Sequence, residues 1–199
     1  MTDLWSSLTQ EAAAHLAALV RIDTTNPPGR EKAAADYVAA ALAEAGIQAE
    51  VVEPAPERGS VIGRLRGSGE ADPLLLLAHL DVVPAVASEW RHDPFGGVTV
   101  DGEIWGRGTL DCKHLAAIWL TLLCHFKREG RRLRRDLILA ATADEEMGGT
   151  WASSGWLTTA STSLRPPGAS TRAEAGRCPS RGNLTSPTRP PKKPSAGSS

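Results

Sequence analysis

The sequence has few of the features that define disulfide-rich, membrane-spanning or nucleic-acid-binding proteins. Its three cysteines are too few for a disulfide framework. The longest apolar run without a charged side chain, His114–Phe126, falls short of the roughly 20 residues that a membrane helix needs. A formal charge of −1 leaves no basic excess for nucleic acid. We therefore expect neither a nucleic-acid nor a membrane partner.

The cysteine count and the first residues both favour the cytoplasm. An odd number of cysteines, three, is typical of a reducing compartment. Residues 1–20 carry no basic region followed by an apolar stretch and a small-residue cleavage site. The sequence therefore predicts a cytoplasmic protein.

The chain divides into two unlike parts near Trp151. Residues 1–150 carry 15 basic and 22 acidic side chains, whereas residues 151–199 carry seven basic side chains and the single acid Glu174. The second part contains no Ile, Val, Phe, Met or Tyr, and 33 of its 49 residues are Ser, Thr, Pro, Gly or Arg. Such a composition buries too little apolar surface to offset the entropy of ordering. We expect a folded region over 1–151 and a disordered basic tail over 152–199.

The hydrophobic pattern of the first part predicts alternating helices and strands. Apolar residues at three- and four-residue spacing indicate helices over residues 3–22, 31–45 and 112–127. Strands are expected over residues 51–52, 61–65, 74–78, 98–105 and 137–142. The apolar runs Leu74–Ala78 and Leu137–Thr142 are typical of strands buried on both faces. The predicted fold class is α/β, with a three-layer, mostly parallel sheet flanked by helices.

The first chemical cluster, His79 and Asp81, follows the strand over 74–78. Ligands of open α/β sheets bind beyond the carboxyl ends of the strands. Residues i and i+2 of an extended chain point to the same side, so Asp81 can accept the second ring N–H of a metal-bound His79. A plain structural hydrogen bond between the two residues is the alternative.

The second cluster is the glycine-flanked loop Gly106–Asp111, directly before a predicted helix. Two glycines allow a tight loop that presents Asp111 to a ligand. Because aspartate is also a favourable N-cap, the alternative is that Asp111 begins the helix and has no catalytic role.

The third cluster, Asp144, Glu145 and Glu146, follows the strand over 137–142. Adjacent carboxylates repel one another, so a cation must compensate them if they are enclosed. A solvated acidic turn is the alternative. Carboxylates with one imidazole suit zinc, cobalt or manganese, and a spare carboxylate can act as a general base.

Five strings in these segments carry a resemblance to a known family. They are RIDTTNPPG, LLLLAHLDVVP, DPFGG, IWGRGTLDCK and ATADEEMGG, and they extend from about Leu16 to Trp151. In order and spacing the chain resembles the dizinc peptidase and amidohydrolase family of carboxypeptidase G, aminoacylase, acetylornithine deacetylase and succinyl-diaminopimelate desuccinylase.

The resemblance implies a role for each residue of the site. His79 would bind one metal ion and Asp81 would orient its ring. Asp111 would bridge both ions and be followed by a non-proline cis peptide. Glu145 would be the general base, and Glu146 would bind the second ion.

The resemblance also implies cofactors and partners. Intact relatives hold two zinc ions, with cobalt or manganese as substitutes, and act on small peptides or N-acyl amino acids. They form homodimers through a second domain that is absent here. One departure is Cys112–Leu115, where many members have Met-Lys-Gly-Gly. We expect His114 to be a surface or packing residue and not a ligand.

Two metal ligands of the family, an acid and a histidine, are missing downstream of Glu146, so the domain is expected to be incomplete. A frame slip would explain the loss. One nucleotide restored after the Trp151 codon allows the chain to continue Trp-Gly-Val-Glu-Trp-Leu. In that frame Ser170–Gly176 can encode Asn-Glu-Gly-Gly-Gly-Arg, the missing acidic motif. The sequence thus predicts truncation by a frameshift after Trp151.

Three functions remain open at this point. The chain is a fragment of a metal-dependent amide hydrolase, and the truncated form is expected to be inactive. Alternatively it is a non-enzymatic pseudoenzyme or metal-binding remnant. The third possibility is an adaptor whose basic tail binds an acidic partner.

Overall fold

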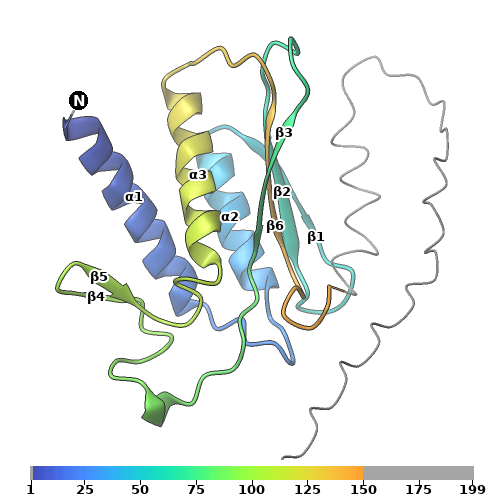
Figure 1. The fold of residues 1–199 in the computed structure, drawn as a ribbon. Helices are drawn as coiled ribbons and strands as arrows, with labels where there is room; N and C mark the ends of the chain where they lie inside the picture. Colours follow the sequence, from blue (N-terminus) through green and yellow to red (C-terminus); the bar gives the residue numbers. More distant parts are fainter. Residues whose placement is uncertain (1, 150–199) are drawn as a thin grey trace, which may run out of the picture. The chain divides into compact units, whose positions relative to one another are not determined.

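The computed structural model describes residues 2–149, which lie within one compact unit, Met1–Pro167 (Figure 1). The helices are α1 (Thr2–Arg21), α2 (Lys32–Glu44) and α3 (Lys113–Arg128), with a short 3-10 helix η1 (Ala87–Glu89). The strands are β1 (Gln48–Val52), β2 (Ser60–Leu65), β3 (Leu74–His79), β4 (Val98–Val100), β5 (Glu103–Trp105) and β6 (Leu137–Thr142). This order confirms the predicted alternation, and a turn at Asp101 and Gly102 divides the strand expected over 98–105 into the hairpin β4–β5. The predicted tail over 152–199 lies outside the described residues.

The main sheet has four strands in the order β1-β2-β6-β3. β3 and β6 pair in parallel, whereas β1 with β2 and β2 with β6 pair antiparallel. β1, β3 and β6 therefore run in one direction and β2 in the other, so the sheet is mixed, with one parallel pairing. The reason is the connections, because a short loop joins β1 to β2, whereas the longer connection through α3 joins β3 to the parallel β6.

All three α-helices lie on the same side of this sheet (Figure 1). α2 covers β1 and β2, α3 covers β3 and β6, and α1 packs on α3. The core cluster under these helices takes alternate strand residues, such as Val61, Leu137 and Leu139. The α/β class and the helix-flanked sheet are confirmed. A helical layer on the opposite face, required by the three-layer prediction, is not among residues 2–149.

The two apolar runs differ in burial. Every residue of β6 is buried, as expected. In β3 the prediction of burial on both faces is wrong, because Leu75 and Leu77 are 38% and 52% exposed. Among the described strands β6 has a neighbour on each side, whereas β3 pairs only with β6 and forms an edge.

Helix ends follow local chemistry. The N–H of Gly46 (φ +71°) bonds to Ala43 O and that of Ile47 to Leu42 O, so Gly46 ends α2 as the glycine of a Schellman motif, as its sequence predicts. None of the helices in residues 2–149 is long and apolar enough to span a bilayer.

Candidate metal centre

Three segments that carry the predicted site residues meet beyond the carboxyl ends of the parallel pair β3 and β6. His79 is the last residue of β3 and lies opposite Thr142, the last residue of β6. Asp111 stands immediately before α3, and Glu145 follows β6 after a short turn. The pairing of two parallel strands thus brings together residues that are 66 positions apart, from His79 to Glu145.

The His79 ring is buried and points at two carboxylates. Its Nε2 lies 2.9 Å from Asp111 Oδ1 and 3.8 Å from Glu145 Oε2. Burial alone would lower the pKa of the imidazole, but its contacts with Asp81, Cys112 and Asp111 outweigh burial and raise the pKa to about 11. The carboxylates and the thiol around the ring therefore favour its protonated form.

The second ring nitrogen of His79 lies beside Asp81. Its shorter contact is with the backbone carbonyl of Asp81, and not with the carboxylate that the sequence predicted. Nδ1 lies 3.0 Å from the backbone carbonyl of Asp81 and 3.4 Å from the carboxylate Oδ1. The buried carboxylate accepts the backbone N–H groups of Glu145 and Glu146 at 3.1 and 3.0 Å. Asp81 therefore ties the end of β3 to the loop that follows β6.

Asp111 is not the N-cap of α3. That position belongs to Cys112, which makes no side-chain capping hydrogen bond. The Asp111 carboxylate is 76% exposed and turned to His79 instead. The peptide between Asp111 and Cys112 is cis and does not involve proline, as the resemblance implied.

The described residues contain one group of side chains with the spacing of metal ligands. It consists of His79, Asp111 and Cys112, whose donor atoms all lie within 4.8 Å of one another. Glu146, the third expected ligand, is not in this group. Burial, followed by repulsion from Asp111, raises the pKa of the Glu146 carboxyl. The structure therefore brings His79 and Asp111 into contact and leaves Glu146 further out.

A buried cation compensates the acidic turn after β6. Arg58 is 6% exposed, forms an ion pair with Asp144 and lies 3.3 Å from the carboxylate of Glu31. Glu31 is fully buried, and this burial raises the pKa of its carboxyl to about 7 although Arg58 opposes the shift. Of the three adjacent carboxylates, only Asp144 is buried, and its compensating cation is an arginine from the loop before β2, whereas Glu145 is exposed.

Asn26 joins this ion pair to the metal centre. Its amide nitrogen donates to Asp81 at 2.8 Å and to Asp144 at 3.2 Å, and its oxygen accepts from Arg58 at 3.1 Å. Asn26 lies in the string RIDTTNPPG, which carries part of the resemblance but assigns Asn26 no role, and Arg58 lies in none of the five strings. A polar residue among prolines was the available signal for Asn26, whereas nothing in the local pattern distinguished Arg58.

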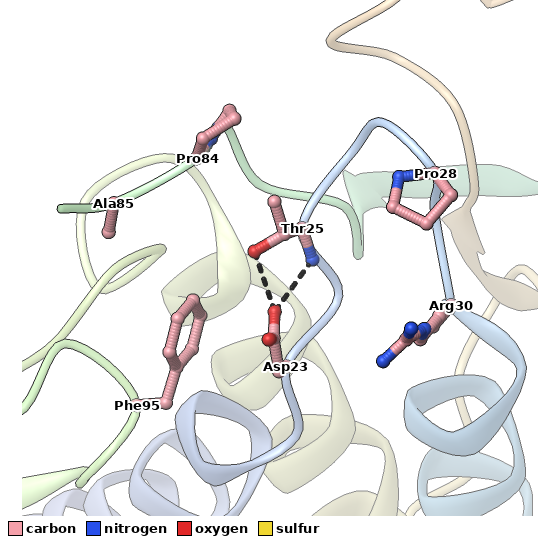
Figure 2. A pocket seen from close by; sticks show the side chains of 7 residues that line it. All are labelled: Asp23, Thr25, Pro28, Arg30, Pro84, Ala85 and Phe95. Carbon is pink, nitrogen blue, oxygen red and sulfur yellow. Dashed lines mark hydrogen bonds between the residues drawn. The ribbon is translucent and has the colours of Figure 1, made fainter. Parts of the chain in front are cut away.

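A pocket of about 270 Å³ lies next to the segment that follows Asp81. Figure 2 shows Phe95 and Ala85 on one side, Pro28 and Arg30 on the other, and Thr25 between them. Its remaining lining residues are Asp23 and Pro84. Thr25 donates to Asp23 through both its backbone N–H and its hydroxyl, at 2.9 and 2.6 Å. The pocket thus offers an aromatic wall and two groups of opposite charge.

Comparisons with known proteins identify relatives in sequence. Succinyl-diaminopimelate desuccinylase of Methylobacterium radiotolerans is 36% identical over 143 residues, covering 68% of this chain and 35% of that protein. Aminoacylase-1 of Sus scrofa is 34% identical over 134 residues, covering 65% of this chain and 32% of that protein. The chain thus spans about a third of the length of these relatives.

Solved structures share the fold. The M20 family metallo-carboxypeptidase of Sulfolobus solfataricus has a TM-score of 0.66 at 19% identity, covering 78% of this chain and 35% of that one. Human carnosine dipeptidase 1 has a TM-score of 0.63 at 22% identity, covering 71% and 33%. Residues 75–178, which include β3, the Asp111 loop and β6, match Peptidase family M20/M25/M40. The chain therefore belongs to this family.

Proposed function

We propose that this chain carries part of the active site of a metal-dependent hydrolase of amide bonds. The observation that carries the proposal is the convergence of three groups at one sheet edge. Asp111 Oδ1 and Glu145 Oε2 lie 2.9 and 3.8 Å from the same nitrogen, His79 Nε2. The nitrogen and the Asp111 oxygen are ligands of the kind that zinc prefers.

The donor chemistry fits a divalent metal ion. A raised pKa of the His79 imidazole indicates a surplus of negative charge around the ring, which a bound cation would neutralise. His79 and Asp111 would hold the ion, and Glu146 would be a further ligand of the site. Zinc is the proposed ion, with cobalt or manganese as substitutes, and two ions are proposed for the complete site. Once bound, the metal would polarise the scissile carbonyl and activate water.

The chain's own residues divide the remaining work. Glu145 is the general base, because its carboxylate is 63% exposed and lies within reach of the space beside His79 and Asp111. It takes a proton from water at Oε2 and later returns it to the leaving amine. Asp81 is a positioning residue, because it holds His79 on one side and the backbone of Glu145 and Glu146 on the other.

The proposed substrate is a small peptide or an N-acyl amino acid. Support comes from the names of the relatives, which include a desuccinylase, an aminoacylase and a carnosine dipeptidase. The proposed compartment is the cytoplasm, where Cys112 and Cys124 would stay in the free thiol form that they have in the structure. Homodimerisation is proposed only for a full-length form with its second domain.

We further propose that the 199-residue chain is hydrolytically silent and that its last residues, 152–199, are read out of frame. The described residues hold His79, Asp111 and Glu146 for two ions, whereas a catalytic zinc usually has three protein ligands. A metal-binding protein without hydrolase activity is the alternative, and the single ligand group of His79, Asp111 and Cys112 favours it.

The test compares the 199-residue chain with a version whose frame is restored after Trp151. Both are loaded with zinc and assayed on dipeptides and N-acyl amino acids. We expect turnover only from the restored version, abolished by Glu145→Gln and by a chelator but unaffected by Glu89→Gln, an exposed glutamate in η1. Turnover that survives Glu145→Gln would refute the assignment of the base. Sequencing the coding DNA around the Trp151 codon tests the frameshift directly.

A further inference from the structure

Cys112 has no part in the proposed reaction, yet its thiol lies in the metal centre. Its sulfur accepts the backbone N–H of His79 at 3.3 Å. The same sulfur lies within 4.8 Å of a His79 ring nitrogen and of an Asp111 carboxylate oxygen. Three donor atoms of different chemistry thus surround one small space at the start of α3.

The separations suit one shared ion. With bonds of about 2.0–2.3 Å in a tetrahedral arrangement, two ligand atoms of one zinc lie about 3.5 Å apart. The 2.9 Å between His79 Nε2 and Asp111 Oδ1 is somewhat short of this value, and 4.8 Å is the upper limit for the others. Small side-chain rotations would bring all three onto an ion.

The backbone directly after Cys112 is fixed. The next residue, Lys113, is fully buried, and its ammonium group donates to the carbonyls of Leu19 and Ile22 at 3.0 and 2.8 Å. The Lys113 N–H bonds to Gly108 O at 2.9 Å. Cys112 is also the N-cap residue of α3. The thiol is therefore held at the start of the helix by a fixed backbone.

We propose that Cys112 is a metal ligand, so that His79, Asp111 and Cys112 together bind one zinc-class ion and leave a fourth position open. The inference rests on the metal centre proposed above but not on hydrolysis. As the metal–sulfur bond forms, the thiol proton is released to solvent. Three protein ligands and one open position are the arrangement of a catalytic zinc site.

A sulfur ligand changes which metals are preferred. Thiolates select soft or borderline ions, whereas carboxylates alone suit magnesium and manganese. We therefore expect zinc, cadmium and cobalt to bind this chain more tightly than manganese. Methionine, which many relatives have at this position, offers only a weakly binding thioether and would not give this preference.

Cobalt titration of the 199-residue chain tests the proposal, because a cobalt–thiolate bond gives a charge-transfer absorption in the near ultraviolet. The absorption is expected in the unaltered chain and in two control variants, Cys124→Ala and Cys178→Ala. Cys124 is 3% exposed in the core and contacts Ala41 O, so it is a matched thiol outside the centre. Cys112→Ser and Cys112→Met should lose the absorption, and cobalt affinity should fall by about tenfold or more, since even the loss of a residue that only supports a ligand costs that much.

The outcomes separate this inference from the proposed function. Cobalt binding that depends on His79 but shows no thiolate absorption would overturn the role of Cys112 and leave the metal centre intact. An absorption that persists in Cys112→Ser would also overturn it. The absence of any cobalt binding by the folded chain would overturn both proposals. A thiolate absorption without hydrolysis in the frame-restored protein would leave this inference standing and refute the proposed activity.

Discussion

β3 and β6 are neighbouring parallel strands with similar sequences and very different surroundings. They pair in register from Leu74 opposite Leu137 to His79 opposite Thr142. β6 is buried throughout, whereas Leu77 of β3 is 52% exposed. The comparison shows that an apolar run predicts a strand, but that burial depends on what lies on either side of that strand.

The two strands also end in different chemistry. β3 leads into His79, whose ring faces the exposed carboxylate of Asp111. β6 leads into Asp144, a buried carboxylate paired with Arg58. The end of β3 therefore faces an exposed carboxylate, whereas Asp144 anchors the start of the loop that carries Glu145 and Glu146 after β6. The following predictions test this division.

Removing the buried ion pair at the end of β6 should cause the largest loss of stability. Arg58→Met removes the buried cation and leaves Asp144 and Glu31 without it, which should cost about 3–5 kcal/mol of unfolding free energy. Arg66→Met is the matched control, since the Arg66 side chain is 61% exposed and comes no closer than 3.9 Å to the Asp136 carboxylate. Urea denaturation measures both. A similar small loss in both variants would mean that the Arg58 ion pair is not an anchor.

The loss of stability caused by truncating a leucine should also differ between the two strands. Leu139→Ala in β6 removes a fully buried side chain from the core and should cost about 2–5 kcal/mol. Leu77→Ala in β3 truncates a half-exposed side chain and should change stability by about 0.5 kcal/mol. Equal losses in urea denaturation would show that the exposed face of β3 is covered in solution.

Local sequence patterns were sufficient to predict where the main helices and strands lie. Helical spacing in α1, α2 and α3 and apolar runs in β3 and β6 place these elements within one or two residues of their observed ends. The direction of β2 and the exposure of β3 could not be predicted, because pairing partners are set by contacts between distant segments. A run of four leucines has the same hydrophobicity at a sheet edge as at its centre.

The candidate site was predictable where a residue is presented by a strand end and not where it arrives from a loop. His79, Asp81, Asp111 and Glu145 follow strands or a glycine-flanked turn, and the structure brings them together. Asn26 and Arg58 come from irregular loops, and only the folded chain places them beside Asp81 and Asp144. Loop residues such as Asn26 and Arg58 follow no periodic sequence pattern, because their role depends on which charged side chains the fold buries beside them.

Metal binding at the end of β3 should depend on pH in a defined direction. The pKa of His79 is raised from 6.5 to about 11, so the imidazole of the metal-free chain is protonated at neutral pH. A metal must displace this proton, so cobalt affinity should rise with pH by about tenfold per unit for each proton released. Spectroscopic titration at several pH values measures the slope. His79→Ala should abolish binding and His92→Ala should not, and an affinity independent of pH would contradict the raised pKa.

The smallest expected effect is on the pH dependence of stability, and it comes from Glu31, the second carboxylate beside Arg58. Burial raises the pKa of its carboxyl from 4.5 to about 7, so between these values the native chain binds more protons than the unfolded chain. The unfolding free energy contributed by Glu31 is therefore fully present below pH 4.5 and is lost as the pH rises through about 7. Asp81 and Asp136, whose pKa values are lowered from 3.8, give the opposite slope only at more acid pH.

Urea denaturation between pH 4.5 and 7 measures this dependence. Glu31→Gln should remove the decline of the unfolding free energy over this range, whereas Glu44→Gln, exposed at the other end of α2, should keep it. Parallel pH curves for Glu31→Gln and the unaltered chain would show that Glu31 is ionised in the fold and that Arg58 neutralises it together with Asp144.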